Sequence, residues 1–114
     1  EGVSKGRLSL NEFAAVTSTN PAKIFGMYPK KGVLAPGSDA DIVLVNPDME
    51  VTITKNILHE NVDYTPYEGI QVKGWPVMTM VRGQAVVENE RLQVPLGFGR
   101  YINRKPVKYT ELLK

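Results

Sequence analysis

Two aspartates are the side chains best placed to carry acid–base or metal chemistry. Asp39 and Asp41 stand two positions apart, so on an extended segment both carboxylates lie on one face and could share a proton or bind a cation. The structural alternative is that Asp39 bonds the backbone of its own turn, while Asp41 accepts from amides where a strand begins. We expect the structural role, because Pro36-Gly37 is typical of a tight turn and an aliphatic run follows the two aspartates.

His59 is the single histidine of the chain, and the chain has no cysteine. It has no histidine or cysteine companion at metal-ligand spacing, and a metal site or a general base needs several converging groups. A Ser-His-Asp triad would also have to be built around this one residue. We therefore predict no catalytic, metal-binding or substrate-binding residue within the 114 residues.

The last twenty residues contain two further patterns that could bind ligands. Gly97-Phe98-Gly99 is similar to the start of a phosphate loop, but no strand leads in, no helix follows and no Lys-Ser or Lys-Thr completes it. The basic tail could be read as a nucleic-acid strip or as an arm on a neighbouring subunit, and two prolines favour the arm. The tail residues are Arg100, Arg104, Lys105, Lys108 and Lys114, interleaved with Tyr101 and Tyr109.

Composition narrows the class of protein. The net charge of +2 is spread along the chain, which argues against a nucleic-acid partner. No apolar run approaches the ~20 residues of a membrane span, so no membrane partner is expected. Without cysteine the chain can form no disulfide, so nothing in it indicates an oxidising compartment, and we expect the cytoplasm. The chain starts with glutamate, its first five residues do not form a signal peptide, and it is expected to be a piece of a longer protein.

Helical signals are confined to the first third of the chain. Ser9 and Glu12 fit a capping box that starts a helix, and apolar residues at 10, 13, 14 and 16 then make one apolar face. Asn20-Pro21 indicates a second helix start, so a break is expected at Thr19-Asn20. Gly26 can end this second short helix in the left-handed conformation.

Strand signals follow. We expect strands over residues 42–45 and 51–54, a loop over 56–74, and strands over 77–81, 84–87 and 92–94. Arg82-Gly83 and residues 88–90 are the expected turns of an antiparallel meander. The continuous apolar run at 42–45 predicts a strand covered on both faces.

The fold class is therefore α+β, with two short N-terminal helices, a mainly antiparallel half of a β-sandwich and an extended C-terminal arm. Three parts are expected: residues 1–31, helices that pack on a missing barrel; residues 32–94, the C-terminal part of the sandwich with an inserted loop at 56–74; and residues 95–114, the arm.

Seven motifs in order carry a resemblance to a known family. The chain resembles the C-terminal region of the hydantoinase and dihydropyrimidinase branch of the amidohydrolases, from about Ser9 to Pro106. The motifs are STNPAKIFG (18–26), PKKG (29–32), APGSDADIVL (35–44), YEG (67–69), VKG (72–74), VRG (81–83) and GFGRYI (97–102). The Asn-Pro-Ala part of the first motif and the third motif are shared more loosely by dihydroorotases, allantoinases and other amidohydrolases, whereas the aromatic loop and the last motif indicate the hydantoinase branch.

The resemblance implies a parent enzyme with a metal-bearing (β/α)8 barrel and a small β-sandwich, which opens hydantoin or dihydropyrimidine rings. It implies a divalent metal, expected to be zinc, whose ligands precede the matched region, so none is carried over to this chain. It also implies a homo-oligomer in which the arm packs on a neighbouring subunit. The contact candidates are Gly97, Phe98, Gly99, Arg100, Tyr101 and Ile102.

Three alternatives stay open. The chain could be part of a non-enzymatic relative that keeps the fold as an assembly scaffold, or of an allantoinase or dihydroorotase. It could also be a small free-standing binding module that shares the sandwich. The apolar helix face argues against the module, because Leu10, Phe13 and Val16 would need a barrel or another partner to cover them. An isolated half-sandwich with open edges is further expected to self-associate.

Overall fold

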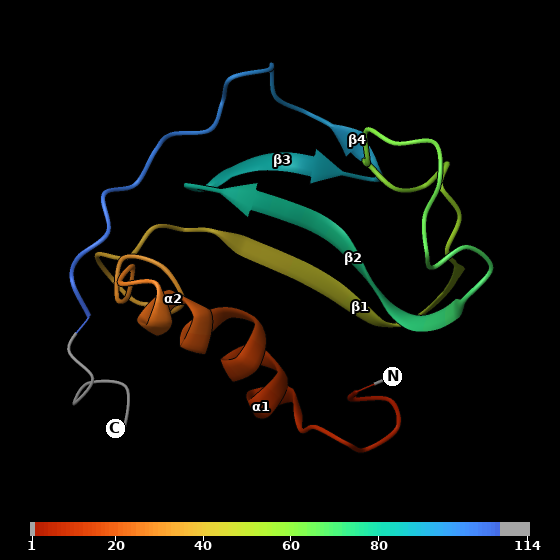
Figure 1. Ribbon diagram of the computed structural model, residues 1–114, viewed down its shortest axis with the longest axis horizontal. Helices are drawn as coiled ribbons and strands as arrows, with labels where there is room; N and C mark the ends of the chain where they lie inside the picture. The colour runs from red at the N-terminus through yellow and green to blue at the C-terminus, as the bar shows by residue number, and fades with distance from the viewer. Residues whose placement is uncertain (1, 108–114) are drawn as a thin grey trace.

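The computed structural model describes residues 2–107 of the chain, as a helical segment followed by one antiparallel sheet (Figure 1). The helical segment consists of α1 (Leu10–Ala14), the π-helical turn η1 (Ala15–Thr19) and α2 (Asn20–Ile24). The sheet contains β1 (Ile42–Thr52), β2 (Gln71–Val81), β3 (Gln84–Glu88) and β4 (Arg91–Leu92), in the order β1-β2-β3-β4. The α+β class and the antiparallel meander are thereby confirmed.

The helix begins at the capping box that the sequence predicts. The Glu12 amide donates to the Ser9 hydroxyl oxygen over 3.2 Å, and the Ser9 amide donates to the Glu12 carboxylate over 2.8 Å. The hydrogen bonds from the Ser9 amide and hydroxyl lower the pKa of Glu12. Two amides that would have no partner at a helix start therefore donate to side-chain oxygens of Ser9 and Glu12.

The expected break at Thr19-Asn20 is wrong, because the helical backbone continues through both residues. Asn20 has helical angles (φ −66°, ψ −45°), and its amide donates to the carbonyl of Ala15, five residues earlier. Pro21 has no amide to donate, and its ring crowds the carbonyl of the preceding turn. The wider π-type turn just before it lets the helix pass the proline without stopping.

Gly26 ends the helical segment as predicted. It has a φ of +69°, its amide donates to the Lys23 carbonyl, and the Met27 amide donates to the Ala22 carbonyl over 2.8 Å. This pair of bonds is a Schellman motif, in which a left-handed residue is needed and glycine pays no steric penalty.

The two strands expected at 42–45 and 51–54 are one strand, β1. The pairing of β1 with β2 jumps from Asn46 opposite Trp75 to Glu50 opposite Lys73. Pro47 lies in the skipped stretch, where no amide is required for the ladder. The proline therefore bends β1 without ending it.

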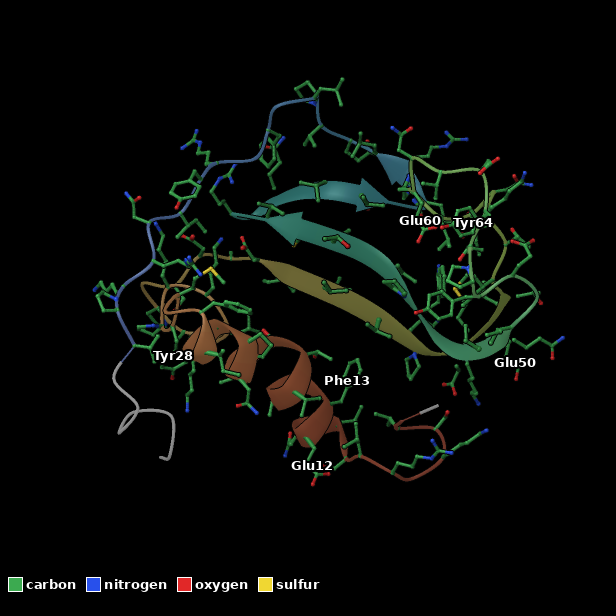
Figure 2. All side chains as sticks on the ribbon, in the orientation of Figure 1. Glu12, Phe13, Tyr28, Glu50, Glu60 and Tyr64 are labelled. Atoms are coloured by element: carbon green, nitrogen blue, oxygen red, sulfur yellow. The ribbon has the colours of Figure 1, made fainter. Side chains whose placement is uncertain are left out.

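The connection between β1 and β2 is shorter than the expected loop over 56–74. The Ile53 amide donates to the Ile70 carbonyl, and the Gly69 amide donates to the Ile53 carbonyl, so the loop spans 53–70 and its two ends are joined. Figure 2 shows Glu60 and Tyr64 on this loop, at the opposite end of the sheet from α2. β2 consequently begins six residues earlier than the expected strand at 77–81.

The later turns are confirmed. Arg82 and Gly83 both have positive φ, at 51° and 79°, which is the geometry of a tight hairpin turn whose twist matches its strands. Asn89 and Glu90 repeat it, with φ of 50° and 61°. β4 is the short pair Arg91–Leu92, so the strand expected at 92–94 begins and ends earlier.

The expectation that both faces of residues 42–45 are covered is wrong within this chain. Val43, Leu44 and Val45 are 57%, 47% and 50% exposed. Across residues 2–107, the buried residues are Ala22, which is 3% exposed, and Thr65, which is 7% exposed. The apolar helix face is open as well, with Leu10 71% exposed. The fold therefore carries apolar surfaces of core composition that residues 2–107 do not cover.

Candidate functional site

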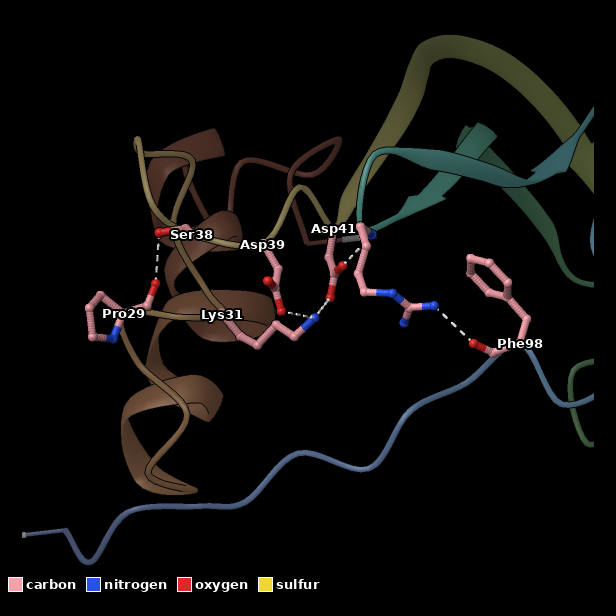
Figure 3. Close-up of polar contacts among 7 residues, drawn as sticks. Pro29, Lys31, Ser38, Asp39, Asp41 and Phe98 are labelled. Atoms are coloured by element: carbon pink, nitrogen blue, oxygen red, sulfur yellow. Dashed lines mark hydrogen bonds and ion pairs between the residues drawn. The ribbon is translucent and has the colours of Figure 1, made fainter.

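The strongest polar cluster lies where the helical segment, the sheet and the C-terminal segment meet (Figure 3). Its members, which we call the Lys31 cluster, are Lys31, Asp39, Asp41, Arg82 and Phe98. The Lys31 ammonium lies 2.9 Å from a carboxylate oxygen of Asp39 and also pairs with the Asp41 carboxylate. The Lys31 side chain is 14% exposed, while the side chains of Asp39 and Asp41 are 25% and 34% exposed, so the ion pairs are partly screened by solvent.

Asp41 joins the start of β1 to the β2–β3 turn. Its second carboxylate oxygen accepts from the Arg82 amide over 2.9 Å, and the Gly83 amide donates to the neighbouring Ala40 carbonyl over 2.9 Å. The structural role predicted for Asp41 is confirmed. Asp39 differs in detail, because its carboxylate pairs with Lys31 instead of an amide of its own turn.

The electrostatics of the cluster favour the charged forms of Asp41 and Lys31. Burial alone would raise the pKa of Asp41, but hydrogen bonds from Lys31 and the Arg82 amide outweigh it and lower that pKa. Burial alone would lower the pKa of Lys31, yet its bonds to Asp41 and Asp39 leave it raised. A carboxylate and an ammonium held this way exchange no proton near neutral pH. The cluster therefore acts as a structural tie.

Metal binding has no support from these side chains. In the part of the chain that the structure describes, no group of three or more His, Cys, Asp or Glu side chains lies together. The two carboxylates of the Lys31 cluster face an ammonium, which repels a cation. His59 is exposed on the loop 53–70, where Glu60 is its acidic sequence neighbour.

Arg82 connects the Lys31 cluster to the C-terminal segment. Its guanidinium donates to the Phe98 carbonyl over 2.9 Å and lies 4.5 Å from the centre of the Phe98 ring. Phe98 is one of the six predicted subunit-contact residues, and it contacts its own chain here. Tyr101 is 87% exposed; Gly97, Gly99 and Arg100 are exposed and Ile102 is half-buried.

The basic tail is only partly described. Arg100, Arg104 and Lys105 are exposed along an extended segment, while Lys108, Tyr109 and Lys114 lie outside the described residues. Among residues 2–107, no helix is both long and apolar enough to cross a membrane.

Sequence reasoning missed Lys31 and Arg82 as members of the site. Lys31 lies between Lys30 and Gly32, and Arg82 was predicted as a turn residue. Neither has a nearby residue in the sequence that would indicate its partner. Lys31 is ten residues from Asp41, and Arg82 is 41 residues from it. The one usable signal was the pair of aspartates themselves, because two carboxylates at a strand entrance need cationic or amide partners.

Comparison with known proteins places the chain in a family. The model described as the amidohydrolase family matches residues 2–86, which include the helical segment, β1, β2 and most of β3.

The chain belongs to the amidohydrolase family.

Curated relatives narrow the branch. This amidohydrolase chain is 44% identical over 113 residues to a D-hydantoinase of Geobacillus stearothermophilus, covering 99% of the chain and 24% of that protein. It is 42% identical over 108 residues to a D-hydantoinase of Ralstonia pickettii, covering 95% of the chain and again 24% of the relative. The amidohydrolase chain thus spans about a quarter of the length of the curated relatives it matches.

Solved structures agree. A crystal structure of dihydropyrimidinase from Brevibacillus agri NCHU1002 matches with a TM-score of 0.90 and 48% identity, over 94% of this chain and 23% of that one. A structure of D-hydantoinase matches with a TM-score of 0.90 and 42% identity, over the same shares. The resemblance to the hydantoinase and dihydropyrimidinase branch, predicted from the motifs, is confirmed for this amidohydrolase chain.

Proposed function

We propose that the chain is the non-catalytic C-terminal part of a longer, metal-dependent cyclic amide hydrolase of the hydantoinase and dihydropyrimidinase type. The observation that carries the proposal is the coverage of the relatives, in which 99% of this chain matches 24% of a D-hydantoinase at 44% identity. The complete protein would open hydantoin or dihydropyrimidine rings by hydrolysis of a ring amide.

The metal of the proposed parent does not fit the residues of this chain. A divalent metal, zinc by our expectation, would activate the attacking water in such an enzyme. The carboxylates of the Lys31 cluster are already paired with an ammonium, and the described residues offer no converging set of ligands. We therefore assign the ligands to residues outside these 114, and no catalytic step to this chain.

The role of the chain in the parent would be structural. The helix face with Leu10, Phe13 and Val16 would pack on the barrel, residues 32–94 would contribute strands to the sandwich, and residues 95–114 would form the arm. The open apolar surfaces support this, because exposed side chains of core type indicate a covering partner. The parent is proposed to be cytoplasmic and homo-oligomeric, with Gly97–Ile102 at the subunit contact.

A comparison of metal content and turnover tests the proposal. The 114-residue chain and the longest product of its gene are expressed side by side, and metal is quantified by mass spectrometry with hydrolysis of hydantoin and dihydrouracil. We expect the longest product to carry metal and turn over, and the short chain to be metal-free and inert. Asp41→Asn in the longest product is the control, and it should leave the metal content unchanged.

Two outcomes would contradict the proposal. Stoichiometric metal in the short chain would mean that Asp39, Asp41 or His59 is a metal ligand. A longest product that folds but neither binds metal nor hydrolyses either ring would instead favour the scaffold relative.

Self-association of the isolated chain is a second expected result. β1 is an edge strand of 11 residues with exposed Val43, Leu44 and Val45, and such an edge pairs readily with another copy. We expect light scattering at high concentration to give a mass above that of one chain. Val43→Lys should shift the mass toward the monomer, while Thr52→Lys at the polar end of β1 should not. A strictly monomeric wild-type chain would refute the expectation.

A further inference from the structure

The loop 53–70 presents acidic and aromatic side chains to solvent at the end of the sheet away from α2 (Figure 2). Its exposed acids are Glu60, Asp63 and Glu68. Its basic side chains at neutral pH are limited to Lys55, so the loop has a net negative charge. Tyr64 and Tyr67 are exposed between these acids. Tyrosine is enriched in protein interfaces and charged groups form their rims, so the loop has the composition of a contact surface.

The segment 100–105, which we call the basic segment, has the opposite charge. Its exposed cations are Arg100, Arg104 and Lys105. It contains no acidic residue, and the Tyr101 side chain among these cations is 87% exposed. Arginine and tyrosine are both enriched where proteins contact one another. The basic segment therefore complements the loop 53–70 in charge and shares its exposed aromatic character.

Within one copy of the chain the two surfaces lie at opposite ends. The basic segment follows Phe98, whose carbonyl accepts from the Arg82 guanidinium, and ends where the Lys105 amide donates to the Gly26 carbonyl over 3.0 Å. β1 leads away from that end for 11 residues before the loop begins, which is about 30 Å of strand. Figure 1 shows the loop in green and the far end of the arm in blue beside α2.

The same two attachments hold the backbone of the basic segment in place before any partner arrives. Gly26 allows a close approach, because a Cβ at that position would stand 2.1 Å from the Lys105 carbonyl oxygen. The Arg82 guanidinium fixes the other end at Phe98. A segment that is already ordered loses less conformational freedom on binding. The basic segment is thus prepared to dock on a surface of another molecule.

We propose that the basic segment of one copy docks on the loop 53–70 of a second copy, with Tyr101 against Tyr64 and Tyr67 and the cations facing the acids. A second copy is the occupant because every copy carries the complementary surface. Since the two surfaces lie at opposite ends, two antiparallel copies make the contact twice, and the pair is closed. The inference rests on the homo-oligomer of the proposed function and names the surface that receives the arm.

Carbodiimide cross-linking tests the contact directly in the longest product of the gene. The reagent joins a lysine to a carboxylate that touches it and leaves no spacer between them. In an equal mixture of unlabelled and heavy-isotope-labelled protein, we expect peptides in which Lys105 of one copy is joined to Glu60 or Asp63 of the other. Absence of such mixed pairs would overturn the proposal.

Charge reversal separates this contact from a loop that the rest of its own chain covers. Arg104→Glu with Lys105→Glu makes the segment acidic. Glu60→Lys with Asp63→Lys makes the loop basic, so each double variant opposes like charges in both contacts. We expect the dissociation constant of the assembly, measured by sedimentation, to rise at least tenfold in either variant. A mixture of the two variants should return to within about threefold of wild type, because opposite charges then meet again.

Asp48→Lys with Glu90→Lys is the matched control, since it reverses two exposed acids outside the loop and should leave association unchanged. Unchanged association in the loop variant refutes the proposal and would place the loop against the rest of its own chain. Weakening that the mixture does not restore also refutes it, because the two surfaces would then act separately. Failure of the proposed function is read differently, as a longest product without metal or turnover.

Discussion

Gly32→Ala is expected to destabilise the packing of the helical segment by about 2–6 kcal/mol. Gly32 has a φ of +83°, so a side chain there carries backbone strain of about 1–3 kcal/mol. Its new Cβ would also stand 2.5 Å from the Ala22 Cβ and 3.1 Å from the Ser18 carbonyl oxygen. Crowding of a closely packed contact adds about 1–3 kcal/mol.

The helix cannot move away from Gly32 without further loss. The Thr19 hydroxyl donates to the Gly32 carbonyl over 2.7 Å, and Ala22 is one of the few buried side chains of the described residues. A shift that relieves the Cβ contact would break that hydrogen bond and expose Ala22. The strain therefore stays at the contact and appears as lost stability.

Hydrogen exchange measures this loss locally. In the longest product of the gene, amides of α1 to α2 should exchange at least thirtyfold faster in Gly32→Ala, since ~1.4 kcal/mol corresponds to a factor of ten. Gly37→Ala is the matched control, because Gly37 has a similar φ of +89° but no atom within 4 Å of its Cβ position. Equal effects of the two variants would show that the Ala22 contact is not the cause.

Lys31→Met is expected to cost about 1–2 kcal/mol of unfolding free energy at neutral pH. The ammonium serves two carboxylates at once, and a hydrogen bond to a charged group contributes about 1.5–3 kcal/mol, less where solvent screens it. The Asp41 side chain is 34% exposed, so the lower part of that range applies. Without the ammonium, Asp39 and Asp41 repel each other as neighbouring like charges.

The pH dependence gives this prediction its sign. The lowered pKa of Asp41 stabilises the fold above the ordinary value of 3.8, and this contribution is lost as the pH falls through the lowered value. The raised pKa of Lys31 stabilises the fold below 10.5, and that contribution is lost as the pH rises through the raised value. Lys31→Met should therefore abolish the alkaline loss and weaken the acid one.

Urea unfolding midpoints at pH 3, 7 and 11 test both the acid and the alkaline loss of stability. Lys73→Met is the control, since the Lys73–Asp48 pair is 3.2 Å long with side chains 50% and 82% exposed. Such a surface pair contributes about 0–1 kcal/mol. A midpoint of Lys31→Met at pH 7 that equals that of Lys73→Met would contradict the proposed tie.

Local elements could be predicted because their determinants lie within a few residues of one another. The capping box joins Ser9 to Glu12 three positions away, and the tight turn at Arg82-Gly83 needs only two residues with positive φ. Gly26 ended the helix where the apolar pattern stopped. Each of these structures is decided by hydrogen bonds and backbone sterics that neighbouring residues supply, so the order of residue types suffices.

Errors arose where a local signal met a longer-range constraint. Two separate strands were predicted on either side of Pro47, at 42–45 and 51–54, yet pairing with β2 on both sides of the bulge keeps β1 continuous. Asn20-Pro21 read as a new helix start, yet a π-type turn carried the helix past it. In both cases the missing amide of proline is accommodated, by an unpaired stretch of β1 for Pro47 and by the π-type turn for Pro21. Neither arrangement can be recognised from the residues next to the proline.

The sequence by itself determined the α+β class, the order of the helical segment and the antiparallel meander, and, through motifs in fixed order, the amidohydrolase family. Only the tertiary structure decided that Lys31 and Arg82 complete the site of Asp39 and Asp41, that Phe98 lies on Arg82, and that the apolar run at 42–45 stays uncovered. The physical reason is range. Hydrogen bonds within a turn follow from adjacent residue types, whereas the hydrogen bond from the Arg82 amide to Asp41, 41 positions away, and the covering of an apolar face depend on the path of the whole chain.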